Sequence, residues 1–204
     1  FIAKFLTLNL SLILNEKLRI PIVLAPIGSL QTFTQKGGAA ATKSATDFGI
    51  VHVVSSVTEP SLEEIAAVSN TPKIYQLYIH GDWDWTKEMI QRAKSAGYKA
   101  LCITVDTASY SRRERPMLND YIPFSQQTSE ASKSEVNQFG QIDGELKAFS
   151  MASVTWDTID KIKKEWGKPL LLKGIATKED AKIALEHGIE CIWVSNHGGR
   201  QLDH

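Results

Sequence analysis

The chain has 204 residues, of which 43% are hydrophobic, so it can bury a sizeable core and falls within the usual size of one domain. Its 23 Lys and Arg balance 23 Asp and Glu, and a formal net charge of zero gives no field to attract nucleic acid or an anionic membrane surface. We therefore expect one soluble globular domain over residues 1–204, with no nucleic-acid partner.

The N-terminal segment and the cysteines carry the only signals about the cellular compartment. The stretch from Phe5 to Leu14 is apolar, but polar residues interrupt it and it is too short to span a bilayer. We expect neither a membrane span nor a cleaved leader. Cys102 and Cys191 each lie in an apolar run, which favours buried thiols over a disulfide and indicates a reducing compartment.

Short apolar runs rich in β-branched residues recur along the chain, and each is followed by a polar stretch with helical spacing. This pattern is typical of repeated βα units. In chain order, the predicted strands are Ile22–Pro26, Ile50–Ser55, Lys73–Tyr78, Ala100–Asp106, Leu170–Gly174 and Cys191–Asn196. The predicted helices are Gly38–Asp47, Ser61–Val68, Trp85–Ala96, Thr155–Glu165 and Thr177–Glu186.

Local signals mark several helix ends. Ser61 lies three residues before Glu64, and Thr177 lies three before Asp180, as in a capping box or its Asp variant. Glycines follow three of the predicted helices, where a left-handed residue would end each one, at Gly97, Gly167 and Gly188.

The strands are apolar almost throughout, which favours a parallel sheet covered by helices. An open doubly wound sheet and a closed barrel are the two alternatives. The glycines after the first strand lack the G-x-G-x-x-G spacing of a dinucleotide fold, which weakens the first alternative. The segment from Arg112 to Ser153 has no sustained periodicity, and we expect a mobile excursion that is weakly packed from Gln126 to Ala148.

Nearly every predicted strand ends in polar side chains, and the carboxyl ends of barrel strands converge on the face where barrel enzymes place their chemistry. Singly, Ser55, Gln76 and Thr104 are equally well explained as partners for strand-end backbone groups. Lys173 follows apolar residues within its strand, so it must find a partner or reach solvent. The set comprises Ser55, Ser56, Gln76, Tyr78, Thr104, Asp106, Lys173, Ser195, Asn196 and His197.

The run from Ser195 to Asp203 is the most informative segment. It holds His197 and Arg200 three residues apart around two glycines, a turn that could aim both side chains into one pocket. Arg112 and Arg113 follow the fourth strand. Two guanidiniums from different loops could clamp a substrate carboxylate with bidentate geometry.

Together these residues resemble the FMN-dependent 2-hydroxy acid oxidases and dehydrogenases, a family that includes glycolate oxidases, lactate oxidases, mandelate dehydrogenases and flavocytochrome lactate dehydrogenases. The resemblance runs from about Pro21 to the last residue and is strongest over Ser195–Asp203. Shorter blocks support it in the same order: Ala25-Pro26-Ile27-Gly28, Ser55-Ser56, Tyr75-Gln76-Leu77-Tyr78, Thr104-Val105-Asp106-Thr107 leading to Arg112-Arg113-Glu114, and Leu172-Lys173-Gly174.

The resemblance implies a (β/α)8 TIM barrel, an α/β fold of which this chain holds about six βα units. Strands seven and eight, whose loops usually bind the phosphate, would lie outside it, as would a substrate-binding tyrosine near the N-terminus. FMN would be the cofactor and a small 2-hydroxy acid the substrate, with no metal site. Family members suggest a homotetramer in the cytoplasm, or in peroxisomes for a eukaryotic glycolate-oxidase type.

The resemblance also implies a role for each residue. His197 would take a proton from the substrate, and Asp106 would stabilise the resulting imidazolium. Arg113 and Arg200 would bind the substrate carboxylate, while Tyr78 would hydrogen-bond the 2-hydroxyl group. The flavin would contact the backbone of Ile27 and Gly28 near N5, Lys173 at its N1–O2 edge, and the side chains of Ser55, Gln76, Thr104 and Ser195.

Two departures bear on specificity. Many glycolate-type members have Ala in place of Gly28 and an aromatic residue in place of Val57, so an acid larger than glycolate would fit more easily. The residues do not distinguish oxygen from another electron acceptor. We favour oxidation of an L-2-hydroxy acid over an inactive fragment that binds flavin weakly or has a structural role. A different FMN barrel reaction such as isomerisation would not need His197 and the two arginines.

Overall fold

Six strands pair in parallel and in sequence order to form one sheet. The computed structural model describes residues 14, 17–108, 115, 118–120 and 153–199. The predicted parallel set is confirmed, and no strand end differs from its prediction by more than two residues. The strands are β1 (Val23–Leu24), β2 (Val51–Ser55), β3 (Ile74–Leu77), β4 (Ala100–Thr104), β5 (Leu170–Ile175) and β6 (Cys191–Val194).

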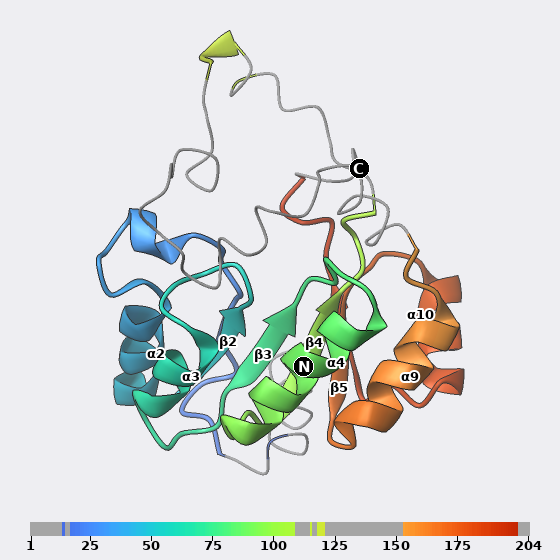
Figure 1. Cartoon of the computed structure of the whole chain (residues 1–204), viewed down its shortest axis with the longest axis horizontal. Helices are drawn as coiled ribbons and strands as arrows, with labels where there is room; N and C mark the ends of the chain where they lie inside the picture. The colour runs from blue at the N-terminus through green and yellow to red at the C-terminus, as the bar shows by residue number, and fades with distance from the viewer. Residues whose placement is uncertain (1–13, 15–16, 109–114, 116–117, 121–152, 200–204) are drawn as a thin grey trace.

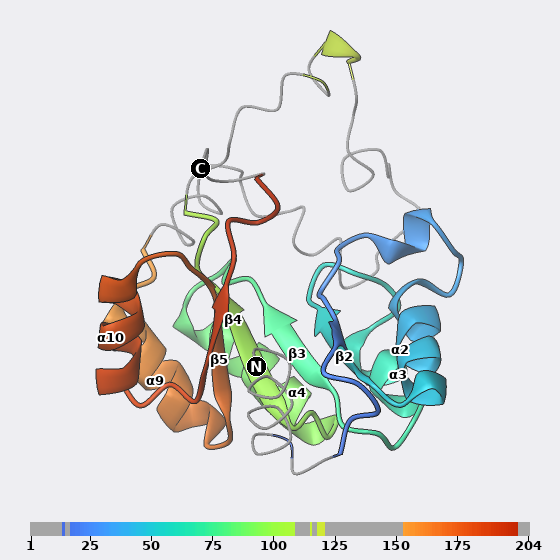
Figure 2. The ribbon, with the colours of Figure 1, turned by 180° about the vertical axis from the view of Figure 1, so that it is seen from behind.

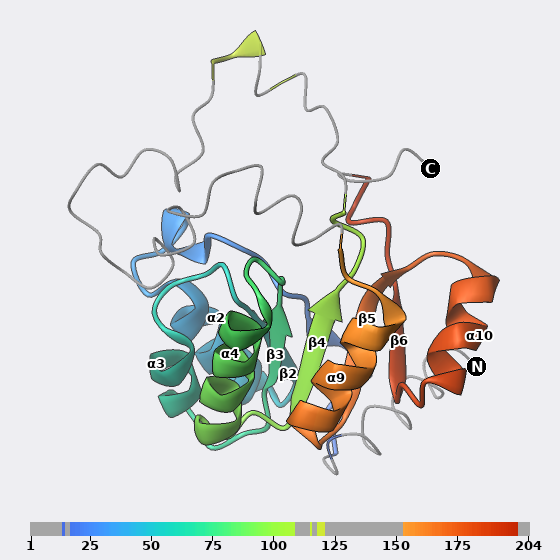
Figure 3. The ribbon, with the colours of Figure 1, turned by 45° about the vertical axis from the view of Figure 1, so that its right-hand side comes forward.

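The helices cover the outer side of the curved sheet, as Figure 1 shows, and Figure 2 shows the sheet from its other side. In Figure 3, α10 and α9 flank the end of the sheet formed by β5 and β6. A short 3-10 helix, η1 (Leu30–Thr32), is the one described element that the periodicity did not predict. The α-helices are α2 (Gly37–Phe48), α3 (Leu62–Ala67), α4 (Trp83–Ser95), α9 (Trp156–Trp166) and α10 (Lys178–Glu186).

The capping signals at two helix starts are present in the structure. The amide of Glu64 donates to Ser61 Oγ at 3.3 Å, and the amide of Ser61 donates to Glu64 Oε2 at 3.0 Å, which completes a capping box. At α10, the amide of Asp180 donates to Thr177 Oγ1 at 3.1 Å. These bonds satisfy backbone N–H groups that have no partner within the helix.

The start of α4 differs from its prediction by two residues. Asp82 is the N-cap, and its Oδ1 accepts from the amide of Trp85 at 2.9 Å, so the helix begins at Trp83. The predicted glycine stops are confirmed by their left-handed φ angles, which are 84° at Gly97, 64° at Gly167 and 66° at Gly188.

Alternate side chains of each strand enter two separate cores. On β4, Leu101 and Ile103 belong to the outer core beneath the helices, while Ala100 and Cys102 belong to the inner core on the concave side. Leu14 and Leu18 fill part of that inner core from the N-terminal side. Successive side chains of a strand point to opposite faces. The strand-end residues two positions after an inner-core residue, such as Gln76, Thr104 and Lys173, therefore also face the concave side.

The sheet has two open edges among the described residues. β1 pairs only with β2, and β6 pairs only with β5. This arrangement is the incomplete barrel that the sequence predicted, because a closed barrel would pair its first and last strands. The segment predicted to be weakly packed, Gln126 to Ala148, lies outside the described residues.

Both cysteines are free, as predicted. Cys102 is fully buried, and burial raises the pKa of its thiol to about 12. Cys191 is only partly buried, because it lies on β6 at an open edge of the sheet, and burial also raises the pKa of its thiol. Within the described part of the chain, no helix is both long and apolar enough to cross a bilayer.

Candidate active site

The loops after β3, β4 and β6 bring three predicted catalytic side chains together. His197 Nε2 lies 3.2 Å from the hydroxyl oxygen of Tyr78, and His197 Nδ1 lies 2.9 Å from Asp106 Oδ1. These residues are separated by up to 119 positions in the sequence, so only the parallel sheet explains their contact. The prediction that the strand ends share one face is confirmed.

The carboxylate of Asp106 is the more deeply buried partner of the His–Asp pair. Its side chain is 0% exposed, against 19% for His197. Oδ2 of Asp106 is buried and has no hydrogen-bond partner among the described residues. A buried carboxylate at Nδ1 fixes the orientation of the imidazole and leaves Nε2 directed at the hydroxyl of Tyr78.

The backbone around His197 is held in a conformation that few residues adopt. The φ angle of His197 is 60°, in the left-handed region, and its amide donates to Ser195 Oγ at 3.0 Å. Side-chain and main-chain oxygens of Asn196 both accept from the amide of Gly199 at 3.1 Å. These bonds offset a strain of about 1 kcal/mol for a non-glycine residue at positive φ.

A polar layer lies on the concave side of the central strands. Gln76 is fully buried, and its Nε2 donates to Thr104 Oγ1 at 2.9 Å. Its other amide atom, Oε1, is buried with no hydrogen-bond partner among the described residues. At the neighbouring strand end, Ser55 Oγ accepts from the amide of Val57 at 3.3 Å. The unpaired Oε1 of Gln76 marks a position where a hydrogen-bond donor from a ligand would fit.

Lys173 is buried on the same concave side, with 8% of its surface exposed. Its Nζ lies 3.4 Å from Ser195 Oγ and 6.0 Å from the ring centroid of Trp193. The part of the chain that the structure describes places no carboxylate within ion-pairing distance of Nζ. The polar neighbour of Lys173 is therefore the Ser195 hydroxyl rather than a carboxylate, an arrangement that suits contact with an anionic ligand.

Of the other predicted residues, two lie outside the part of the chain that the structure describes and two lie after β1. Arg113 and Arg200 lie outside the described residues. Ile27 is 53% exposed after β1, and a Cβ added to Gly28 would come 2.8 Å from Val57 Cγ2. The two departures noted in the sequence are thus in contact: Val57 occupies space that an alanine side chain at position 28 would enter.

Two neighbours of Tyr78, Ser56 and His80, were given no role from the sequence, although Ser56 was among the polar residues at the strand ends. The amide of Tyr78 donates to Ser56 Oγ at 3.2 Å, and the ring of His80 stacks on its phenol ring at a centroid distance of 5.7 Å. The edge of Trp85 packs against His80 at 6.3 Å. The only sequence signal for His80 was its position two residues after Tyr78, because side chains two apart on an extended segment share a face.

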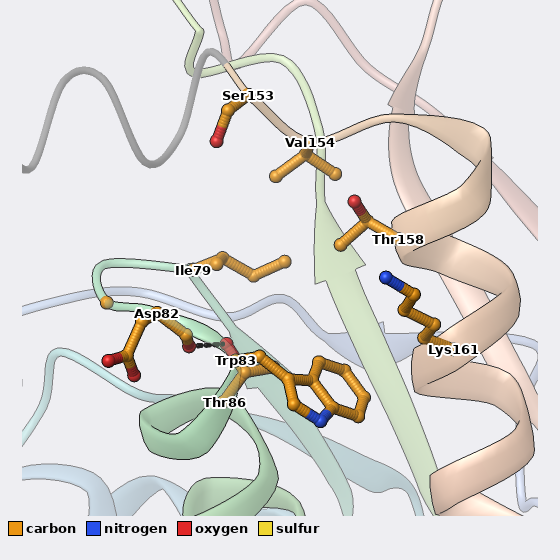
Figure 4. Close-up of a pocket in the computed structure, with 9 residues that line it drawn as sticks. Ile79, Asp82, Trp83, Thr86, Ser153, Val154, Thr158 and Lys161 are labelled. Carbon is orange, nitrogen blue, oxygen red and sulfur yellow. Dashed lines mark hydrogen bonds between the residues drawn. The ribbon is translucent and has the colours of Figure 1, made fainter.

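Two cavities lie on the helical side of the sheet. One of about 180 Å³ lies between α4 and α9, and Figure 4 shows Trp83 and Lys161 projecting toward it from the two helices. The other, of about 220 Å³, lies between α9 and β5. Neither is lined by a predicted catalytic, substrate-binding or cofactor-binding residue.

Comparisons with known proteins agree with this geometry. A family described as FMN-dependent dehydrogenase matches residues 7–204. The chain is 36% identical to an L-lactate oxidase from Nostoc sp., covering 94% of this chain and 55% of that protein. It is 35% identical to a peroxisomal (S)-2-hydroxyacid oxidase from Arabidopsis thaliana, covering 94% and 54%.

Solved structures give the same result. The crystal structure of a mandelate oxidase superposes with a TM-score of 0.78 at 32% identity, over 91% of this chain and 52% of that one. A mandelate oxidase variant solved with an FMN adduct superposes with a TM-score of 0.73. The chain therefore spans about half the length of the relatives it matches. With the family match over nearly its whole length, the chain belongs to the FMN-dependent dehydrogenase family.

Proposed function

We propose that the protein containing this chain oxidises an L-2-hydroxy acid to a 2-oxo acid, with FMN as the electron acceptor. The contact of His197 with both Tyr78 and Asp106 carries this proposal, because it pairs a proton acceptor with a buried carboxylate and a hydroxyl donor. The reduced cofactor would pass its electrons to oxygen or to another acceptor.

The residues on the concave side fit FMN. The unpaired Oε1 of Gln76 is an acceptor for a ring N–H, and the buried ammonium of Lys173 suits the edge where a flavin gains negative charge. Ser55, Thr104 and Ser195 would add hydroxyl contacts, and the backbone at Ile27 and Gly28 would face the ring. When bound, FMN supplies two-electron acceptance, which none of these side chains provides.

Three side chains of this chain would bind and stabilise the proton that the substrate loses. Nε2 of His197 is the ring nitrogen that faces Tyr78, and it would accept a proton from the substrate. Asp106 at Nδ1 would stabilise the imidazolium that results. The hydroxyl of Tyr78 would hydrogen-bond the 2-hydroxyl group of the substrate and hold it close to Nε2.

The direct test is anaerobic reduction of the bound flavin, followed by absorbance after mixing with lactate, mandelate or a longer 2-hydroxy acid. We expect bleaching of the oxidised flavin with at least one of these acids. Because Val57 is smaller than an aromatic side chain, larger acids should compete well with glycolate. A flavin that stays oxidised with all of them would contradict the proposal.

Replacing Lys173 with Met should weaken FMN binding about tenfold, since a hydrogen bond to a charged group contributes roughly 1.5–3 kcal/mol. FMN fluorescence during titration of the flavin-free protein would measure this loss without any turnover. Lys168 lies two residues before the start of β5, and its Nζ donates to the carbonyl of Tyr98. As the control, Lys168→Met removes a positive charge at the other end of the same strand and should leave FMN binding unchanged. Equal affinities for FMN in the two variants would contradict the placement of Lys173.

Arg113 and Arg200 are proposed to bind the substrate carboxylate. Replacing Arg113 with Lys should raise the substrate dissociation constant roughly tenfold, because Lys cannot make the bidentate contact. The concentration dependence of flavin reduction separates this effect from the limiting rate, which should change less. An unchanged dissociation constant would remove Arg113 from the proposed site.

The oligomeric state is proposed from the family resemblance, and the compartment from the resemblance and one relative. We propose a homo-oligomer, a tetramer, located in the cytoplasm or in peroxisomes as for the Arabidopsis relative. Light scattering of the purified protein would give the number of subunits, and a monomer would contradict the first part. Tagged protein imaged in its own cells would decide the compartment.

A second candidate function follows from the open edges at β1 and β6. A chain that ended there would leave two sheet edges unpaired and would act at most as a weak flavin-binding or structural module. Mass spectrometry of the natural polypeptide distinguishes the two candidates, because about 100 further residues or more would restore a closed barrel.

A further inference from the structure

Gly174 occupies an irregular position in β5, next to the His–Asp pair. Its φ angle is 107°, a backbone conformation that residues with side chains rarely adopt. The pairing of β5 with β6 shifts register between Lys173 and Ile175, so the irregularity is centred on this glycine. Bulges of this kind bend a strand and change the direction of neighbouring groups, often beside active sites.

A side chain at position 174 would collide with Asp106. An added Cβ would lie 2.5 Å from Asp106 Cβ, 2.6 Å from its Cγ and 2.8 Å from its backbone nitrogen. Contacts this short require one partner to move. Asp106 has little freedom to move. The backbone beside it is held by the amide of Val105, which donates to the carbonyl of Lys173 at 2.9 Å, and the Asp106 side chain is fully buried.

We propose that Gly174 is a positioning residue for the reaction, because its missing side chain lets the Asp106 carboxylate reach Nδ1 of His197. The inference rests on the proposed function and adds a residue to it. With Asp106 in place, His197 donates through Nδ1 and keeps Nε2 as the proton acceptor. Displacing the carboxylate by about 1 Å would break this bond, and misplacements of that size can lower a rate 100-fold.

The chain provides a matched control at Gly97. Its φ angle is 84°, yet an added Cβ there would have no heavy atom within 4 Å. Gly97→Ala therefore also places a side chain at positive φ but without a collision, so it shows what a methyl group costs at a positive-φ glycine that has no close neighbour.

The experiment measures anaerobic flavin reduction in the FMN-loaded protein with a 2-hydroxy acid that reduces the wild type. We expect Gly174→Ala to lower the limiting rate about 100-fold while the substrate dissociation constant stays within about threefold, because the variant keeps both proposed carboxylate-binding residues, Arg113 and Arg200. Gly97→Ala should keep the wild-type rate. The inference is overturned if the two variants reduce their flavin at equal rates while Asp106→Asn is slow.

A double-mutant cycle tests the route through Asp106. Once Asp106→Asn has removed the carboxylate, adding Gly174→Ala should cost little further rate, so the two losses should not multiply. Full multiplication would mean that Gly174 acts through another contact. Wild-type rates in both Asp106→Asn and His197→Gln would instead overturn the proposed function and the inference with it.

A measurement without turnover covers the case in which Gly174→Ala folds poorly. Asp106→Gly removes two of the three colliding atoms, so it should reduce the loss in urea midpoint that Gly174→Ala causes. The same loss in both backgrounds would show that Asp106 is not the group displaced, and the inference would be wrong whatever the rates.

Discussion

Replacing His197 with Gln should lower the rate of flavin reduction by a factor of about 100 to 10,000, the usual contribution of a general base. Gln can keep a hydrogen bond to Tyr78 or Asp106, but it cannot accept a proton at neutral pH. FMN content should stay close to that of the wild type, because the polar layer at Gln76 and Thr104 is untouched. Stopped-flow absorbance under anaerobic conditions gives the rate, and the flavin spectrum gives the content.

The chain carries a matched control for this substitution. His187 Nδ1 lies 2.8 Å from Asp160 Oδ1, a second His–Asp pair that bridges α10 and α9 on the outer side of the sheet. His187→Gln removes an imidazole from the same kind of pair and should leave flavin reduction unchanged. The wild-type rate should also fall as pH is lowered, since only a neutral imidazole accepts the proton. A wild-type rate in His197→Gln would remove the proposed base.

The free energy of unfolding should decrease by roughly 3 kcal/mol as pH falls from about 6.5 to about 4, because β2 buries a neutral imidazole. His52 is 2% exposed, and its Nδ1 lies 2.8 Å from Thr42 Oγ1 on α2. Burial, and then the positive charge of Lys73, lower the pKa of His52 from 6.5 to about 4. Between these two values the unfolded chain binds a proton that the folded chain does not, so acid favours unfolding.

Urea unfolding at about pH 7.5 and about pH 4.5 measures this loss, since the two conditions lie on either side of most of the transition. His52→Asn keeps an amide group near the position of Nδ1 for Thr42 but cannot titrate, so it should lose less stability in acid than the wild type. His187→Asn retains His52 and should behave like the wild type in this comparison. Equal acid losses in the wild type and His52→Asn would assign the effect to other groups.

The sequence determined the elements and their order. Apolar β-branched runs, the capping pair at Ser61 and Glu64, and the glycines after the helices are local signals, and local signals specify where strands and helices begin and end. The start of α4 was placed two residues late because Asp82 stands before two tryptophans, where the apolar pattern masks the cap.

The sequence also supplied the chemistry of the site, through residue types at strand ends and their resemblance to a known family. It could not supply distances. His197 and Tyr78 are 119 positions apart, and their contact depends on the parallel register of the intervening strands, which no local pattern encodes.

Tertiary structure alone decided which polar groups are paired. It left Gln76 Oε1 unpaired, gave Lys173 a hydroxyl rather than a carboxylate as its neighbour, and placed Gly174 against Asp106. Each outcome depends on how closely adjacent strands approach at one point, and a glycine in a sequence does not show what its absent side chain would touch. The sequence determined which residues this protein brings to the site. Packing between strands decided how they are paired, because the distance between side chains on adjacent strands depends on how the whole sheet packs.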